Sequence, residues 1–153
     1  MRLDDDIVEN YRLSRAAYSR NALLAAESHY RYNRANHAID LFYEIELPEH
    51  LMFVHPVGTV LGRATYGDFL CVYQNVGVGS DLDGNRPVLG DGVVLFPGAK
   101  VLGKTVISGN VFVMANAVMN GCYVPPNSVA YGYNQSSPTT RSVIRDVFKV
   151  KYV

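Results

Sequence analysis

Five consecutive six-residue steps between Leu89 and Val118 constrain this 153-residue chain more than any other feature. Cut at the large aliphatic residue that opens each step, they read LGDGVV, LFPGAK, VLGKTV, ISGNVF and VMANAV. The first position holds Leu89, Leu95, Val101, Ile107 and Val113, and the fifth holds Val93, Ala99, Thr105, Val111 and Ala117. A spacing of six fits neither a lone helix nor a simple alternating strand. It predicts a parallel β-helix, in which the large residue fills a prism and the small residue lets the corner close.

The repeat extends on both sides of this run. Leu61, Tyr66, Val72 and Val78 keep nearly the same phase. Residues 80–87 (SDLDGNRP) break it with turn-forming residues, so we expect a projecting loop there. We therefore expect a mainly β chain, with a solenoid domain over residues 45–132 and about four to five triangular turns. A C-terminal tail follows over residues 133–153.

Residues 1–44 form a segment of a different kind. Between residues 4 and 43 there is no glycine and no proline, and charge is spread throughout. Asp4, Asp5 and Asp6 suit a helix start, because they face the positive end of the helix dipole. The segment predicts one helix from about residue 5 to 19 and a second from about 21 to 43.

Charge and composition argue against several classes of protein. Fourteen basic and 14 acidic residues give a formal net charge of +0, so binding of nucleic acid or an anionic membrane has no electrostatic support. No apolar stretch approaches the length of a membrane span, and the acidic N-terminus is unlike a signal peptide. Cys71 and Cys122 lack motif spacing and are interpreted as free thiols. A cytoplasmic location is the expectation.

The four histidines differ in what surrounds them. His29 and His37 lie two turns apart on the expected second helix but lack a third ligand, which argues against a metal site. His50, in LPEHL, suits a solvated turn. His55 stands in FVHPVGTVLG, where the coil phase begins. On residue chemistry alone it would be interpreted as a structural histidine.

From about Phe53 to Gly132 the chain resembles the serine acetyltransferase branch of the bacterial hexapeptide-repeat acyltransferases. The matching pieces are FVHPVGTVLG, CVYQNVGVG, SDLDGNRPVLG, PGAKVLGKTVISGNV and VPPNSVAYG. The resemblance implies a left-handed parallel β-helix, acetyl-coenzyme A as acyl donor with no metal required, and a homotrimer with an active site at each subunit junction. The chain is also similar to short acetyltransferases of surface-polysaccharide biosynthesis.

Carried over residue by residue, the resemblance makes His55 the general base that takes the acceptor's proton. It implies a carboxylate partner on the first coil, for which Glu44 is the best positional match and Glu46 and Glu49 are rivals. The implied contacts with the coenzyme are Gly79, Pro97, Ala115 and Asn120, and those with the acceptor are Tyr73, Asn75 and Arg86.

Two departures from the family pattern bear on the acceptor. Val54 stands where the family has an acid before the base, and Arg86 stands where it has a second histidine. We therefore expect an acetyl-coenzyme A-dependent acetyltransferase that acts on a hydroxyl or amine of a small acceptor, with a sugar as first choice. Serine O-acetylation is the alternative.

Two other classes of function are weighed against this interpretation. A γ-type carbonic anhydrase needs three histidines across neighbouring coils, and no histidine follows Gly58. A non-catalytic trimeric scaffold stays open, and acetyl-coenzyme A binding would discriminate it from an enzyme.

Overall fold

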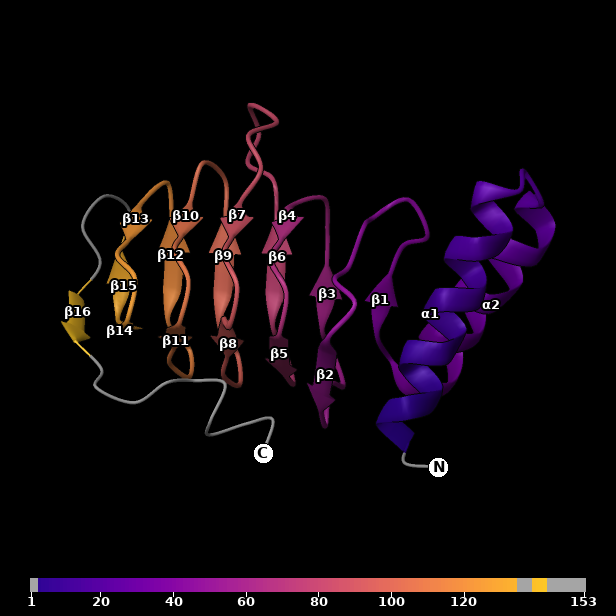
Figure 1. Cartoon of the computed structure of the whole chain (residues 1–153), viewed down its shortest axis with the longest axis horizontal. Coiled ribbons are helices and arrows are strands. Elements are labelled where there is room, and N and C mark those ends of the chain that lie inside the picture. The colour runs from indigo at the N-terminus through magenta and orange to yellow at the C-terminus, as the bar shows by residue number, and fades with distance from the viewer. Residues whose placement is uncertain (1–2, 135–138, 143–153) are drawn as a thin grey trace.

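The computed structural model describes residues 3–134 and 139–142. Two antiparallel helices, α1 (Leu3–Ser19) and α2 (Leu23–His37), stand at one end of a row of short strands (Figure 1). The strands form a left-handed parallel β-helix of about five turns. The fold class predicted from the six-residue register is therefore confirmed.

Three sheets form the faces of the prism. Face A holds β1 (Asp40–Leu41), β3 (Val60–Leu61), β6 (Gly77–Gly79), β9 (Lys100–Leu102), β12 (Val118–Asn120) and β15 (Tyr133–Asn134). Face B holds β2 (Leu51–Val54), β5 (Leu70–Tyr73), β8 (Val94–Leu95), β11 (Val111–Val113), β14 (Ser128–Tyr131) and β16 (Thr139–Ser142). Face C holds β4 (Thr65–Tyr66), β7 (Val88–Leu89), β10 (Val106–Ile107) and β13 (Tyr123–Val124). The chain runs from face A to C to B and back to A, and only β16 pairs antiparallel among the described strands.

The predicted interior rows form the core. Leu89 pairs with Ile107, three six-residue steps later on the same face. The five first-position residues are at most 1% exposed, and so are the five fifth-position residues. Each buried large aliphatic side chain contributes about 1.5–3 kcal/mol. Stacking the coils therefore supplies the burial that a single six-residue step cannot.

The corner between faces B and A, hereafter the BA corner, depends on left-handed backbone. Gly58, Asn75, Gly98 and Asn116 stack along it with φ between +55° and +76°. A Cβ atom on Gly58 would lie 2.3 Å from Asn75 Oδ1, and one on Gly98 would lie 2.2 Å from Asn116 Oδ1. Each asparagine amide thus folds over the glycine of the preceding coil, which leaves no room for a side chain there.

Residues 80–87 project as a loop between β6 and β7, as predicted (Figure 1). The loop leaves the corner between faces A and C, hereafter the AC corner. Asp81 Oδ1 accepts hydrogen bonds from the backbone N–H groups of Asp83 (3.0 Å) and Asn85 (2.9 Å), and Oδ2 accepts from Asn85 Nδ2 (2.8 Å). The side-chain bond from Asn85, together with the backbone donors, lowers the pKa of Asp81.

The second predicted helix was too long. It ends at His37 rather than near residue 43, because Ala38 turns the chain in the left-handed region at φ +51°. Ile39 and Leu41 are each 1% exposed, and β1 pairs with β3. Their burial in the prism outweighs the helix-forming composition of the segment. The solenoid therefore begins at Asp40, before the residue 45 expected.

The helices dock on the first coil through polar groups as well as apolar ones. Tyr11 is 1% exposed, and its hydroxyl donates to the Ile45 carbonyl (2.8 Å) and accepts from the Leu47 N–H (3.0 Å). Asn33 Nδ2 donates to the Ile7 carbonyl at 3.0 Å and ties α2 to α1. In the part of the chain that the structure describes, neither helix has the length and apolar character needed to cross a membrane.

Candidate active site at the BA corner

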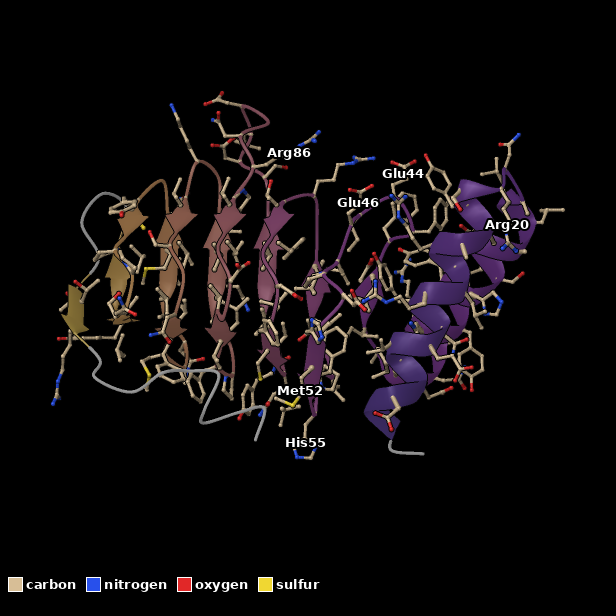
Figure 2. The ribbon with its side chains drawn as sticks, in the orientation of Figure 1. Arg20, Glu44, Glu46, Met52, His55 and Arg86 are labelled. Atoms are coloured by element: carbon tan, nitrogen blue, oxygen red, sulfur yellow. The ribbon has the colours of Figure 1, made fainter. Side chains whose placement is uncertain are left out.

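His55 lies on an expansion of the second coil at the BA corner. Val54 pairs with Tyr73, and the Val57 carbonyl accepts from the Asn75 N–H at 3.0 Å, so residues 55–57 stand opposite Gln74 alone. His55 has φ +50°, a region that non-glycine residues rarely occupy. The expansion exposes His55 at the outer edge of the molecule (Figure 2).

Thr59 closes this expansion. Its side chain is 0% exposed, and its hydroxyl donates to the Tyr73 carbonyl (2.8 Å) and accepts from the Val76 N–H (3.2 Å). The expansion shifts the second coil out of register with the third, so these two backbone groups need another partner. One buried hydroxyl satisfies both and fixes the end of the His55 loop.

The imidazole of His55 differs from the other three in its contacts. His37 Nε2 lies 2.9 Å from Asp6 Oδ2, His50 Nδ1 lies 2.8 Å from Asp68 Oδ2, and His29 Nδ1 lies 3.1 Å from Asn10 Oδ1. No side chain among the described residues hydrogen-bonds the His55 ring. Among the four histidines, His55 is therefore the one whose ring has no side-chain partner in the described structure.

The structure sorts the predicted site residues onto two corners. One group lies along the BA corner and consists of His55, Tyr73, Asn75, Pro97 and Ala115. Successive coils are joined at this corner by hydrogen bonds from the backbone N–H groups of Asn75, Gly98 and Asn116. Glu44, Gly79, Arg86 and Asn120 lie along the AC corner, where Gly79 and Asn120 both pair with Leu102. Figure 2 shows His55 on one edge of the molecule and Glu44, Glu46 and Arg86 on the opposite edge.

Glu44 does not reach His55 within one chain. It pairs instead with Arg63 on the AC corner, and its rival Glu46 pairs with Arg15 of α1. The resemblance implied Glu44 as the best positional match on a first coil that was expected to begin at residue 45. Because the coil begins at Asp40, Glu44 already lies beyond the face A strand and at the next corner.

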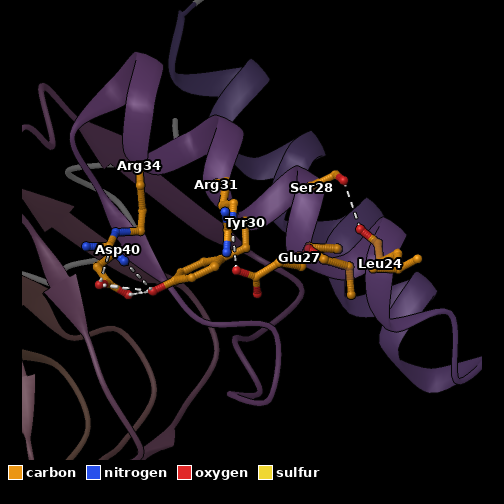
Figure 3. A network of polar contacts seen from close by, with 9 residues as sticks. Leu24, Glu27, Ser28, Tyr30, Arg31, Arg34 and Asp40 are labelled. Carbon is orange, nitrogen blue, oxygen red and sulfur yellow. Dashed lines mark hydrogen bonds and ion pairs between the residues drawn. The ribbon is translucent and has the colours of Figure 1, made fainter.

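Asp40 is an acidic residue beside the BA corner that the sequence comparison did not single out. Its N–H donates to the Thr59 carbonyl (2.9 Å), and the Ala38 carbonyl just before it accepts from the Gly58 N–H (2.8 Å), so Asp40 follows the BA corner directly. The Tyr30 hydroxyl donates to its carboxylate at 3.1 Å, and Arg34 Nε lies 3.7 Å from Oδ2 (Figure 3). The signal was present in the apolar pair Ile39 and Leu41 around it, which alternates as a strand does.

The predicted acceptor residues have different surroundings. Tyr73 stacks on Phe96 with ring centroids 5.2 Å apart. Asn75 is exposed, and its carbonyl accepts a hydrogen bond from Lys100 Nζ. Burial lowers the pKa of Lys100. Arg86 is exposed on the projecting loop of the AC corner.

Two depressions flank His55. One, of about 420 Å³, runs between α1 and β2 and includes Asp5 and Val8. The other, of about 350 Å³, lies between the end of α2 and residues 55–57. Within the described ranges, no three His, Cys, Asp or Glu side chains gather in a way that could hold a metal ion. Cys71 and Cys122 are buried free thiols, as expected.

Comparison with curated proteins gives serine acetyltransferases among the sequence relatives. A serine acetyltransferase of Mycobacterium tuberculosis is 32% identical over 129 residues, which cover 82% of this chain and 56% of the relative. The chain thus spans about half the length of the curated relatives it matches. No family model matches the chain.

Solved structures agree with the sequence comparison. The serine acetyltransferase of Neisseria gonorrhoeae in complex with serine superposes with a TM-score of 0.73 at 25% identity, over 82% of this chain and 53% of that one. A serine acetyltransferase in complex with CoA gives a TM-score of 0.71 at 20% identity, over 90% of this chain and 55% of that one. In sequence and in fold, the chain is a hexapeptide-repeat protein of the serine acetyltransferase-like type.

Proposed function

We propose that the protein transfers the acetyl group of acetyl-coenzyme A to the hydroxyl of serine. The observation that carries the proposal is the exposed His55 imidazole, which has no side-chain partner among the described residues. It stands at a corner whose backbone is fixed by the Thr59 hydroxyl. The similarity to serine acetyltransferases supports serine over the sugar acceptor that the sequence suggested first. The structure solved with CoA supports the same donor here.

His55 does general-base work in this scheme. Its neutral imidazole takes the proton of the serine hydroxyl as the oxygen attacks the thioester carbonyl. The tetrahedral intermediate needs an N–H donor directed at its oxyanion, for which the backbone at Gly79 is the candidate. Collapse breaks the carbon–sulfur bond, and the coenzyme thiolate takes the proton from His55. O-acetylserine and free coenzyme A leave the site.

The two-corner arrangement supports a site shared between subunits. His55, Pro97 and Ala115 lie on the BA corner, whereas Gly79, Arg86 and Asn120 lie on the AC corner. Face A separates the two sets within one chain. In a closed ring of three copies, the BA corner of one subunit can meet the AC corner of the next. We propose that this junction forms the groove for acetyl-coenzyme A and places Gly79 and Arg86 near His55.

The decisive measurement is release of the coenzyme A thiol with L-serine, nucleotide sugars and free sugars as acceptors. We expect L-serine to give the highest kcat/KM and His55→Ala to lower kcat by about 100-fold or more, the usual scale for loss of a general base. His50→Ala, which removes an exposed histidine on another corner, is the control. A protein that fails to bind acetyl-coenzyme A would be a scaffold, and a preference for sugars would restore the first interpretation.

The same assay tests the acid that supports His55. We propose Asp40 for this role in place of Glu44, because its backbone adjoins the BA corner. In the described structure its carboxylate contacts Tyr30 and Arg34, so the role requires the carboxylate to turn to His55 when the acceptor binds. Asp40→Asn should lower kcat by at least about tenfold, since a carboxylate that fixes the imidazole also stabilises its charged form. Glu44→Gln should leave kcat within about twofold, because Glu44 pairs with Arg63 on the AC corner. A larger effect from Glu44→Gln would contradict the assignment of Asp40.

A further inference from the structure

We propose that the depression between the end of α2 and the His55 loop is the acceptor pocket, and that His37 binds the acceptor's ammonium group there. This inference deepens the proposed function and rests on it. His37 stands near the C-terminal end of the helical segment, and sequence spacing alone gave it no role. The structure places it in the same pocket as His55.

The pocket joins both histidines across elements that are distant in sequence. Its volume is about 350 Å³, and its lining includes Ile7, Asn36, His37, His55, Pro56 and Val57. The walls are mostly apolar, and the polar groups come from Asn36 and the two imidazoles. A small molecule with one reactive hydroxyl and one further polar group fits these two polar positions. Its hydroxyl would lie at His55 and its second polar group at His37.

A network of contacts fixes the His37 ring. His37 Nε2 lies 2.9 Å from Asp6 Oδ2, and the side chains are 11% and 23% exposed. Asp6 Oδ1 in turn accepts from Asn10 Nδ2 at 3.1 Å, and Asn10 Oδ1 lies 3.1 Å from His29 Nδ1. Because the ionised carboxylate can only accept, the proton in the first contact lies on Nε2. In the proposed complex the His37 ring is uncharged, so that its Nδ1 is a hydrogen-bond acceptor.

The chemistry of the second polar group follows from this tautomer. A nitrogen that accepts recognises an N–H or O–H donor, and it offers nothing to a carboxylate. The carboxylate of Asp6, whose Oδ2 lies 2.9 Å from His37 Nε2, lowers the electrostatic potential beside the pocket. A negative potential favours a cationic donor over a neutral hydroxyl. The pocket therefore suits a 2-amino alcohol such as serine. Val54, in the strand beside the pocket, has no carboxylate that could bind the ammonium group instead of His37.

Two substitutions separate recognition from structure. His37→Gln places an amide where it can still donate to Asp6 but removes the Nδ1 acceptor. His37→Asn places an amide oxygen at the position of Nδ1 but cannot reach Asp6. If His37 binds ammonium, affinity for serine follows the acceptor atom. If His37 only holds the helices together, both affinity and stability follow the Asp6 contact.

The experiment is an NMR titration of the labelled full chain with L-serine and with 3-hydroxypropanoate, which is serine without its amino group. We expect His37→Gln to weaken serine binding by about tenfold to a hundredfold, the effect of losing a hydrogen bond to a charged group. Binding of 3-hydroxypropanoate should change less than twofold. His37→Asn should keep the preference for serine but lower Tm. His29→Gln, at the far end of the same network, should leave binding of both molecules unchanged.

Other outcomes overturn the inference. Equal loss of both ligands in His37→Gln, or a preference for serine that follows Tm across the three variants, would leave His37 a purely structural residue. Because binding is measured without acetyl transfer, a wild-type chain that binds serine at this pocket but transfers no acetyl group would contradict the proposed function alone. A wild-type chain with no shift at Val57 or Asn36 would contradict the pocket itself.

Discussion

At the scale of single residues, His55 is held in a backbone conformation that costs free energy. A non-glycine residue at φ +50° persists only where its surroundings determine it. Thr59 provides this restraint, because its buried hydroxyl bonds both the Tyr73 carbonyl and the Val76 N–H. The position of His55, the proposed base, thus depends on a buried residue four places along the chain.

Thr59→Val tests this dependence, since valine keeps the shape and removes both hydrogen bonds. We expect a loss of about 1–3 kcal/mol in the free energy of unfolding, because two buried backbone groups lose their partner. We also expect a fall in kcat that exceeds the fall in folded fraction. Urea unfolding and acetyl-transfer assays measure the two effects.

The chain offers a matched control in Thr105. This threonine is also 0% exposed, and its hydroxyl donates to the Leu102 carbonyl (2.6 Å) on the AC corner. Thr105→Val should cost similar stability and leave kcat per folded molecule unchanged. Equal effects of the two variants on kcat would mean that Thr59 stabilises the solenoid without positioning His55.

At the scale of elements, the strands are two to four residues long and depend on the stack for their stability. Alternation within each strand decides which side chain enters the prism. Val101 in β9 is 0% exposed, whereas Val106 at the start of β10 is 38% exposed and faces outward. The same residue type therefore has opposite environments five positions apart.

Val101→Asp should prevent soluble folding, because it buries a charge that has no partner. Val106→Asp should fold with a Tm close to that of the wild type. Circular dichroism and the soluble yield of the two variants provide the measurement. A folded Val101→Asp protein would show that the six-residue register has been assigned to the wrong face.

The loop over residues 80–87 gives an element-scale prediction for pH. The folded pKa of Asp81 lies below its unfolded value of about 3.9, so its contribution to loop order is complete above about pH 4. It is lost as the pH falls through the lower folded value. The amide resonances of Asp83 and Asn85 should shift only below pH 4, and this shift should vanish in Asp81→Asn. A transition near neutral pH would contradict the Asp81 anchor.

At the scale of the whole molecule, the candidate site is divided between two edges of one prism (Figure 2). The proposed assembly of three copies removes this separation without any rearrangement of the chain. Light scattering should therefore give the mass of three chains. A stable monomer with full activity would show that one chain suffices.

Mixed assembly tests the shared site directly. His55→Ala and Arg86→Ala are each expected to lower activity in a uniform trimer. Refolded together in equal amounts, they should regain roughly a quarter of wild-type activity, because a junction is intact only where an unaltered BA corner meets an unaltered AC corner. A mixture no more active than its components would place the whole site within a single subunit.

The solenoid, its interior rows and the projecting loop could be predicted from the order of residues alone. A six-residue period is a local property, and only stacked coils bury Leu89, Leu95, Val101, Ile107 and Val113 together. His55 could be singled out in the same way, because it lies where the regular phase begins. All of these features follow from local sequence patterns, and none depends on how the helices pack on the first coil.

Tertiary structure decided the end of α2 and the neighbours of His55. Helix-forming composition favoured a helix to residue 43, but burial of Ile39 and Leu41 contributes more free energy than the extra helical turns would. Because α2 ends six residues earlier than expected, Glu44 lies at the AC corner and Asp40 lies beside the BA corner. This earlier end also brings His37 and His55 to one pocket. Such contacts join residues that are far apart in the chain, and a local repeat in the sequence cannot predict them.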